Sequence, residues 1–276
     1  MRSGSAGGHG APRTVVVKVG GSLVSDKRTD HDIDEAAVRD YAELVADLVR
    51  SHPGRVVFVA GGGALGHSSV RRKEHDGRLA LLPLTRATFD VKWVWTEAFR
   101  AVGLPAAPLQ AMAMYAEGAD GPVFQTGVVS RLLTAGVLPV LSGDCVLTAD
   151  GGLRILGSDH VPGILLDGSF GQVRVVALTD VPGIHTGPGG DSPVVPYLDA
   201  ADPERAYAYL WPTAEWDTSG AMHGKVEAFI SHAGRGAECV IARGDRKAAG
   251  LRHLMAPMPE WPQDLPRTLI SRSRPV

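Results

Sequence analysis

The sequence predicts an α/β fold, a three-layer αβα sandwich around a central, mostly parallel sheet. Two apolar, β-branched runs, residues 14–19 (TVVVKV) and 56–60 (VVFVA), each stop at glycines, as strands buried on both faces of a parallel sheet do. Between them, residues 33–51 carry apolar side chains at helical spacing. The same alternation continues through the second half of the chain, with no linker between the halves.

The remaining elements follow in the order that such a sandwich needs. Asp30 or Asp32 is available to cap the helix at residues 33–51. A hairpin is expected around residues 149–152 (ADGG), and it interrupts the parallel pattern. The other expected helices are residues 84–102, 130–135, 203–210 and 222–234, and the other expected strands are residues 137–141, 145–148, 153–156, 173–178 and 238–242.

Composition indicates a globular protein and removes several classes of function. With 44% hydrophobic residues over 276 positions, the chain can bury a large core without disulfides or metals. Its 28 Lys and Arg against 30 Asp and Glu give a net charge of −2, which excludes a uniform basic field for nucleic acid or anionic membranes but leaves room for a local basic pocket. Residues 1–12 are expected to be a flexible tail, and no apolar run approaches the length of a membrane helix.

The cysteines and histidines give weaker signals. Cys145 and Cys239 lie in apolar contexts without metal-ligand spacing, which predicts a reducing, cytoplasmic compartment, while a single buried disulfide stays open. The histidines show no paired ligand spacing, so we expect no metal held by the protein alone.

Lys18 is the first candidate for chemistry. It stands near the end of a buried strand, directly before a glycine turn that begins at Gly20 and Gly21 and continues to Ser22. Open α/β sheets bind ligands at the carboxyl ends of their strands, and a buried lysine requires an anion nearby. Lys27, in the polar loop that follows, would by itself be a surface charge.

A run of three glycines follows the second strand. Residues 61–66 (GGGALG) fit the dinucleotide pattern G-x-G-x-x-G, but that pattern normally follows the first strand and needs an acidic residue at the end of a later strand, which is missing here. The glycines Gly62 and Gly63 still allow backbone N–H groups to converge on an anion, and His67 is placed to donate a hydrogen bond to it.

Acidic and basic residues follow further strands. Asp144 and Asp180 each come at the end of a strand, at the edge where Lys18 also emerges, which indicates an ordered charge network. Residues 215–225 (EWDTSGAMHGK) lead into a helix, so Ser219 and the neighbouring N–H groups form another anion seat. Lys225, in the first turns of that helix, opposes the helix dipole unless an anion is bound.

These motifs, in this order, resemble the amino acid kinase superfamily over about residues 13–243. They are KVGGS at 18–22, GGG at 61–63, GD at 143–144, LTDVPGIHT at 178–186 and SGAMHGK at 219–225. The histidine of GGGALGH is similar to that of the isopentenyl phosphate kinase branch. Within this branch, residues 214–225 and 235–245 look most like the fosfomycin resistance kinases.

The resemblance implies transfer of the γ-phosphoryl group of ATP to a phosphonate or phosphate oxygen of a small acceptor, with Mg²⁺ carried on the nucleotide phosphates. It also implies a homodimer, with an acceptor lobe at residues 13–168 and a nucleotide lobe at residues 169–276 of one continuous fold. We expect fosfomycin or a similar small phosphonate as the acceptor, with isopentenyl phosphate or another alkyl phosphate as the alternative. The acceptor pocket is expected to include residues 84–95, where Phe89, Trp93 and Trp95 supply bulk.

Each matched position takes a role from the resemblance. Lys18 and Lys225 neutralise the transferring group from opposite sides, and Asp144 orients the two lysines. Lys27 contacts the acceptor or the γ-phosphate. The expected substrate-binding residues are Gly62, Gly63, His67, Ser158 and Ser219. The expected nucleotide-binding residues are Lys18, Gly20, Gly21, Ser22, Gly63, Asp180, Gly183 and Lys225.

Two other classes of protein stay open as alternatives. One is a catalytically silent binding protein of the same fold, which would bind ATP without turnover. The other is an NAD-dependent dehydrogenase, which depends on the G-x-G-x-x-G coincidence alone.

Overall fold

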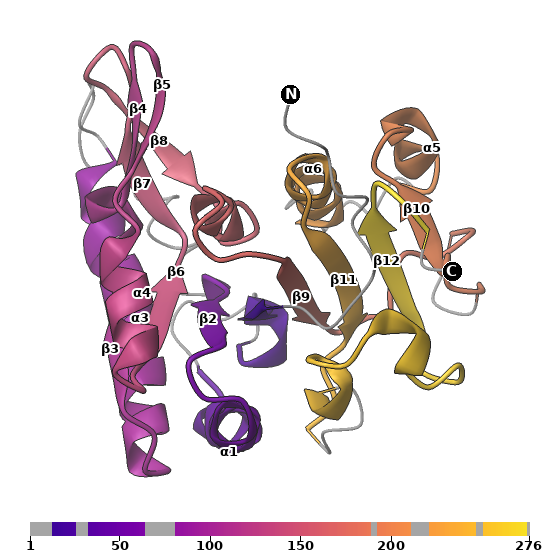
Figure 1. Ribbon diagram of the computed structural model, residues 1–276, viewed down its shortest axis with the longest axis horizontal. Helices are drawn as coiled ribbons and strands as arrows, with labels where there is room; N and C mark the ends of the chain where they lie inside the picture. The colour runs from indigo at the N-terminus through magenta and orange to yellow at the C-terminus, as the bar shows by residue number, and fades with distance from the viewer. Residues whose placement is uncertain are drawn as a thin grey trace.

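The computed structural model describes residues 13–25, 33–63, 81–188, 192–210, 221–246 and 251–274, and the predicted tail at residues 1–12 lies outside these ranges. Its centre is an eight-stranded sheet with the order β10-β12-β11-β9-β1-β2-β6-β3 (Figure 1). The strands of this sheet are β1 (Thr14–Val19), β2 (Val56–Ala60), β3 (Ala106–Pro108), β6 (Leu138–Ser142), β9 (Val173–Thr179), β10 (Tyr197–Asp199), β11 (Glu238–Arg243) and β12 (Arg267–Ser271).

All neighbouring strands of this sheet run parallel except β11 and β12, which run antiparallel. The prediction of a mostly parallel sheet is therefore confirmed. β1 lies between β2 and β9, with Lys18 opposite Val59 on one side and Ala177 on the other. The carboxyl end of β1 thus has a strand end on each side, which is the edge where parallel sheets bind ligands.

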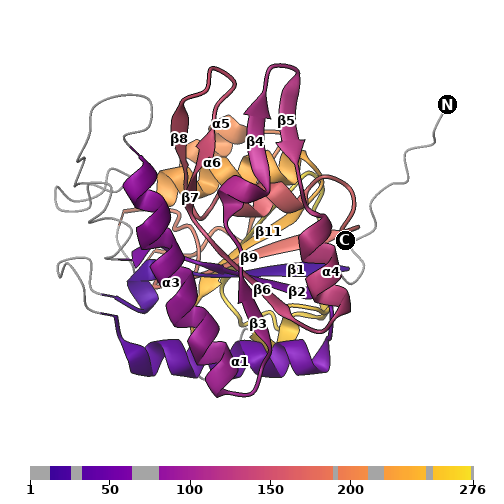
Figure 2. The ribbon, with the colours of Figure 1, turned by 90° about the vertical axis from the view of Figure 1, so that its left-hand side faces the viewer.

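Helices cover both faces of the sheet and complete the three layers. The α-helices are α1 (Glu35–Ser51), α3 (Leu82–Ala101), α4 (Gly127–Thr134), α5 (Pro203–Tyr207) and α6 (Ala221–Gly234). Figure 2 shows α1 on one side of the sheet and α5 and α6 on the other. One buried cluster joins α1 and α3 to the sheet, and a second joins α4, α5 and α6 to the opposite face.

The alternation along β1 decides which layer Lys18 faces. Val15, Val17 and Val19 belong to the cluster under α1 and α3, whereas Val16 belongs to the cluster under α6. Successive side chains of a strand point to opposite faces. Lys18 therefore shares the face of Val16 and points to the layer that contains α6.

Two hairpins stand apart from the main sheet. The predicted hairpin forms from β7 (Asp144–Leu147) and β8 (Leu153–Leu156), which pair antiparallel. A second hairpin, β4 (Tyr115–Gly118) with β5 (Gly121–Phe124), was not predicted. Figure 2 shows both hairpins extending in the same direction, away from α1. The short 3₁₀ helices are η1 (Gly21–Leu23), η2 (Ala111–Ala113), η3 (Val161–Leu165), η4 (Leu251–His253) and η5 (Met258–Glu260).

Several boundaries differ from the sequence prediction. Asp34, rather than Asp30 or Asp32, caps α1, because its side chain accepts a hydrogen bond from the backbone N–H of Ala37 at 2.9 Å. α5 ends at residue 207, earlier than predicted, and β3, β10 and β12 were missed. Cys145 and Cys239 are both buried and free, so the open alternative of a disulfide is wrong.

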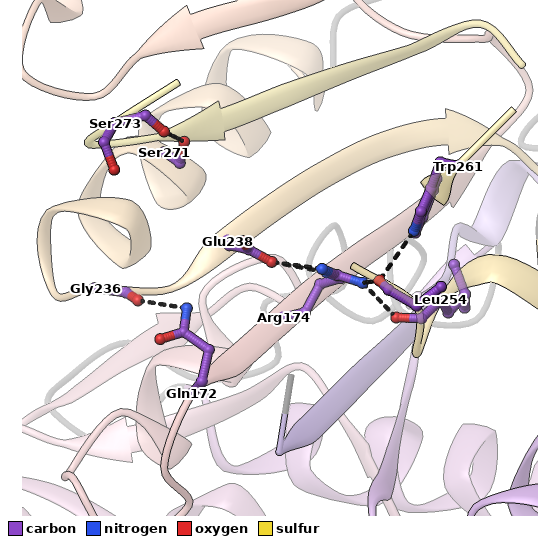
Figure 3. Close-up of polar contacts among 9 residues, drawn as sticks. Gln172, Arg174, Gly236, Glu238, Leu254, Trp261, Ser271 and Ser273 are labelled. Atoms are coloured by element: carbon purple, nitrogen blue, oxygen red, sulfur yellow. Dashed lines mark hydrogen bonds and ion pairs between the residues drawn. The ribbon is translucent and has the colours of Figure 1, made fainter. Parts of the chain in front are cut away.

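A fully buried ion pair ties the C-terminal segment to the sheet. Arg174 on β9 donates to Oε2 of Glu238 on β11 at 2.7 and 2.9 Å, and to the carbonyl oxygens of Leu254 and Ala256 at 2.8 and 2.6 Å (Figure 3). The guanidinium also lies over the ring of Trp261. Within the described ranges, no helix combines the length and apolar character needed to cross a membrane.

Candidate active site

Three charged side chains meet at the carboxyl end of β1. Lys18 donates from Nζ to Oδ1 of Asp159 at 2.5 Å. Lys225, in the second turn of α6, donates to the same oxygen at 2.7 Å. Asp159 lies in the loop between β8 and η3. The two ammonium groups share one carboxylate, so the cluster has a net charge of +1 when both lysines are protonated.

Both lysines are buried, so water does little to screen this excess positive charge. Lys18 is 4% exposed and Lys225 is 6% exposed. Burial lowers the pKa of Lys18 to about 7, with a further lowering from the charge of Lys225 and an opposing pull from Asp159. Burial acts to raise the pKa of Asp159, but the two ammonium groups overcome this and hold that pKa well below its usual range. An additional anion at this point would relieve the repulsion between the lysines.

His232 on α6 positions the backbone of Asp159. Its Nε2 lies 2.9 Å from the carbonyl oxygen of Asp159. Because a carbonyl oxygen only accepts, Nε2 carries the proton and Nδ1 does not. Burial lowers the pKa of His232 to about 4, so the ring is neutral near pH 7. His232 is a positioning residue that the sequence prediction missed.

Asp144 does not have the role that the sequence predicted for it. Its carboxylate accepts hydrogen bonds from the backbone N–H of Cys145 at 2.9 Å and of Met112 at 3.3 Å, and from the hydroxyl of Thr88 at 3.5 Å. These partners come from α3, β7 and the η2 region, and neither lysine is among them, because both lysines donate to Asp159. Asp159, not Asp144, orients Lys18 and Lys225.

Two glycine turns interlock beside Lys18, as the motifs at residues 18–22 and 61–63 indicated. The N–H of Gly61 donates to the carbonyl oxygen of Val19 at 2.8 Å. A Cβ on Gly21 would overlap the backbone of Gly63, and Gly63 itself has a φ of +53°, which favours glycine. No larger residue fits at Gly21 without moving the second turn. The ends of β1 and β2 can therefore approach closely enough to present backbone groups to one ligand.

The other expected site residues in the described ranges lie along the same edge. Ser158 directly precedes Asp159, and its backbone N–H approaches Gly143, where a Cβ would come within 3.1 Å of the nitrogen. Asp180 is exposed just beyond the end of β9. Gly183 is buried against β12, since a Cβ there would come within 2.6 Å of the Thr268 hydroxyl. Gly183 is required for packing at this position, whatever else it contacts.

Of the three aromatic residues expected in the acceptor pocket, Trp95 lines a small pocket beside the glycine turn, and Phe89 and Trp93 do not. Trp95 is 2% exposed and packs in the core against Phe58 and Phe99, with ring centroids 4.6 and 6.0 Å away. Phe89 and Trp93 are 38% and 42% exposed and stack on each other on the outside of the helix. The period of the helix explains the error, because residues 89 and 93 share one face and residue 95 another.

Three expected site residues, Lys27, His67 and Ser219, lie outside the described residues. The site that is described combines two buried ammonium groups, a half-buried carboxylate and the interlocked glycine turns. This arrangement is suited to a polyanion that would compete with Asp159 for both lysines. It is poorly suited to a neutral ligand, which would leave the excess charge in place.

Comparison with known proteins points in one direction. The profile of the amino acid kinase family matches residues 13–243. The chain is 31% identical over 224 residues to isopentenyl phosphate kinase of Haloferax volcanii, covering 79% of this chain and 87% of that protein. It is 22% identical over 235 residues to isopentenyl phosphate kinase of Methanocaldococcus jannaschii, covering 80% and 88%. A solved structure of isopentenyl phosphate kinase covers 94% of this chain and 100% of that chain, with a TM-score of 0.70 and 18% identity, which shows a shared fold.

Proposed function

The chain belongs to the amino acid kinase family and is an ATP-dependent phosphotransferase that acts on a phosphate group, and we propose that its acceptor is a small alkyl phosphate or phosphonate. The observation that carries the proposal is the pair of buried lysines, Lys18 and Lys225, held on one oxygen of Asp159. The isopentenyl phosphate kinase relatives favour an alkyl phosphate. The NAD-dependent dehydrogenase alternative loses its support, because the glycine run belongs to the kinase family pattern.

The reaction needs charge neutralisation more than it needs a base. A phosphate monoester is largely dianionic near neutral pH, since its second pKa is about 6. An acceptor oxygen can therefore attack the γ-phosphorus directly: a new P–O bond forms, the bond to the β,γ-bridging oxygen breaks, and ADP leaves. The barrier comes from the approach of two anions.

The described residues supply what this step requires. Lys18 from β1 and Lys225 from α6 approach Asp159 from different elements, and they would move part of their hydrogen bonding to the transferring group. Asp159 and His232 hold the two ammonium groups in place before the ligand arrives. The site is built of cations and backbone donors, which fits nucleotide phosphates. Mg²⁺ brought with ATP would neutralise part of the phosphate charge.

We further propose that residues 13–168 bind the acceptor and residues 169–276 bind the nucleotide. His67 and the glycines Gly62 and Gly63 would hold the phosphate or phosphonate of the acceptor, and Lys27 and Ser219 would contribute from segments outside the described residues. Homodimer formation and a cytoplasmic location stay predictions. Light scattering after size-exclusion chromatography would measure the first of them directly.

A phosphonate acceptor such as fosfomycin is the second candidate. One observation favours it: the sequence of residues 214–225 resembles that of the fosfomycin resistance kinases. The two candidates differ only in what lies beyond the phosphorus, so the same catalytic residues serve both.

Incubation of the purified protein with Mg-ATP and each acceptor tests the proposal. We expect ADP release coupled to a new phosphoanhydride, seen as phosphorus–phosphorus coupling in ³¹P spectra. A comparison of kcat/KM for isopentenyl phosphate and fosfomycin then ranks the candidates. ATP binding without any phosphorylated product, across both acceptor classes, would instead support the silent binding protein.

A further inference from the structure

A second buried ammonium group, on Lys92 of α3, plays no part in the function proposed above. The Lys92 side chain is 0% exposed, and its Nζ has no hydrogen-bond partner within the described residues. Lysines are almost never fully buried unless they are paired, because desolvating an ammonium group is costly. An unpaired lysine in the interior therefore marks a place where a partner is expected to arrive.

The groups around Lys92 are polar, and most of them already have hydrogen-bond partners. Burial lowers the pKa of Lys92 to about 8, against the opposing influence of Asp144. The carboxylate of Asp144 is already engaged by Thr88 and two backbone N–H groups. Gln110 donates to the carbonyl oxygen of Thr85 at 3.4 Å, while its Oε1 is buried without a partner in the described part of the chain. One region thus contains both an unused donor and an unused acceptor.

These four residues, Thr88, Lys92, Gln110 and Asp144, are called the α3 polar cluster below. Thr85, Thr88 and Lys92 lie at helical spacing on one face of α3, and α3 packs against β7, which in turn packs against η2.

The α3 polar cluster adjoins the glycine turn. Ser142 pairs with Ala60, the residue before Gly61, and its hydroxyl donates to the carbonyl oxygen of Thr88 at 3.1 Å. Three apolar residues of α3 that lie next to Lys92 in the chain, Val91, Val94 and Trp95, line a small pocket together with the glycines of residues 61–63. A ligand whose phosphorus group occupies the glycine turn would extend its carbon chain toward this region of α3.

We propose that the α3 polar cluster recognises an oxygen atom on the carbon skeleton of the acceptor, with Lys92 as the specificity-determining donor. This inference rests on the proposed function. The acceptor class is a short alkyl phosphate or phosphonate that carries an epoxide, ether or hydroxyl oxygen. Such an oxygen would accept from Lys92, and an acceptor without it would leave the ammonium group desolvated and unpaired. Sites built to pair with a substrate oxygen discriminate strongly against the analogue that lacks it.

Matched acceptors test the inference on the full-length protein. Fosfomycin and propylphosphonate share three carbons and differ in the epoxide oxygen, and 3-hydroxy-3-methylbutyl phosphate and 3-methylbutyl phosphate differ in a hydroxyl group. We expect the wild-type kcat/KM to favour the oxygen-bearing member of at least one pair by tenfold or more. Lys92→Met should reduce that preference at least tenfold, mainly through acceptor KM, and Lys92→Gln, which keeps a donor, should retain part of it.

Thr96→Val is the matched control. Thr96 is buried on the same helix, and its hydroxyl donates only to the carbonyl oxygen of Lys92 at 2.7 Å. It should leave the acceptor preference unchanged. A wild-type protein that uses the acceptors but shows no preference within either pair overturns the inference, as does a preference that survives Lys92→Met. Failure to phosphorylate any acceptor would instead overturn the proposed function.

Discussion

Two buried charge clusters lie at opposite ends of the central strands, and they differ in how completely their charges are paired. Arg174 and Glu238 stand at the amino ends of β9 and β11, one cation against one anion, with two carbonyl oxygens completing the guanidinium. Lys18, Asp159 and Lys225 meet at the carboxyl end of β1, two cations against one anion.

The difference separates stability from function. A buried ion pair in which each guanidinium nitrogen has an acceptor gains nothing from a ligand, and removing one partner leaves a charge stranded in the interior. A cluster with an excess ammonium group is incomplete until an anion arrives, so it is a site for binding and for stabilising charge in a reaction. The same sheet therefore carries a structural clamp at one end and a prepared anion site at the other.

The largest effect is expected when either lysine of the cluster at the carboxyl end of β1 is replaced. Lys18→Met and Lys225→Met should each lower kcat by about 10³-fold or more, because positive charge near the transferring group is worth that much in phosphoryl transfer. Neither change should lower the melting temperature, since removing one of two like charges leaves a one-to-one pair with Asp159. Steady-state kinetics and thermal melts measure both. Activity within tenfold of wild type would show that the excess charge is not used.

Changes in the Arg174–Glu238 cluster should lower stability and leave kcat unchanged. Arg174→Met or Glu238→Gln should lower the free energy of unfolding by about 3–5 kcal/mol, because a buried charge loses its partner. The kcat of the protein that remains folded should not change, since this cluster lies far from the carboxyl edge of the sheet. Urea denaturation and kinetics at low temperature test the pair together. A fall in kcat without a loss of stability would contradict the division between the clusters.

The sequence predicted the strand-end residues of the site well, and for a clear reason. Lys18, the glycine turn at residues 61–63 and Lys225 are each fixed by the element that they end or begin, and those elements were visible in apolar runs and helical spacing. Among the missed strands, β3 and β10 have three residues each, and in β12 the apolar run is only Leu269 and Ile270 between polar residues. Neither kind of segment shows the apolar run or the alternation that predicts a strand.

Asp159 was missed because its place depends on tertiary structure. It lies 141 residues from Lys18 in the chain, and the β7–β8 hairpin and η3 together bring it to the lysines. The segment at residues 157–160 (GSDH) directly after a strand was the available signal, but Asp144 gave the same signal earlier in the chain. The two aspartates differ in their partners, since Asp144 accepts from Thr88, Met112 and Cys145 and Asp159 accepts from the two lysines, and only tertiary structure decides this.

A third change tests whether Asp159, rather than Asp144, orients the two lysines. Asp159→Asn should lower kcat by about 10²-fold, because the lysines lose the group that fixes them and small misplacements are costly in an active site. The KM for ATP should fall or stay constant, since the competing carboxylate is gone. Asp144→Asn is the comparison, and its effect should fall on acceptor KM. A larger loss of kcat in Asp144→Asn than in Asp159→Asn would restore the original assignment.

The smallest expected effect is a change in the number of protons that the protein binds. Lys18 has a pKa of about 7 in the free protein, below its ordinary value of 10.5, because burial and Lys225 disfavour its charge. Between these two values the unfolded chain binds more protons than the folded chain, so the unfolding free energy of the free protein should rise with pH across that window. A bound anion reverses the preference and restores the ammonium form. Nucleotide binding at pH 8 should therefore take up close to one proton, and nucleotide affinity should fall as pH rises above about 7.

Calorimetry in two buffers with different ionisation enthalpies measures this uptake, and Lys18→Met is the control that should abolish it. Arg174→Met should leave the uptake unchanged, because its guanidinium is paired in the free protein and gains no partner from the ligand. If nucleotide bound at pH 8 without proton uptake, Lys18 would already be charged in the free protein. Holding two charged lysines against one carboxylate would then cost the free protein little, and a bound anion would have no repulsion to relieve. The two clusters would not differ in the way argued above.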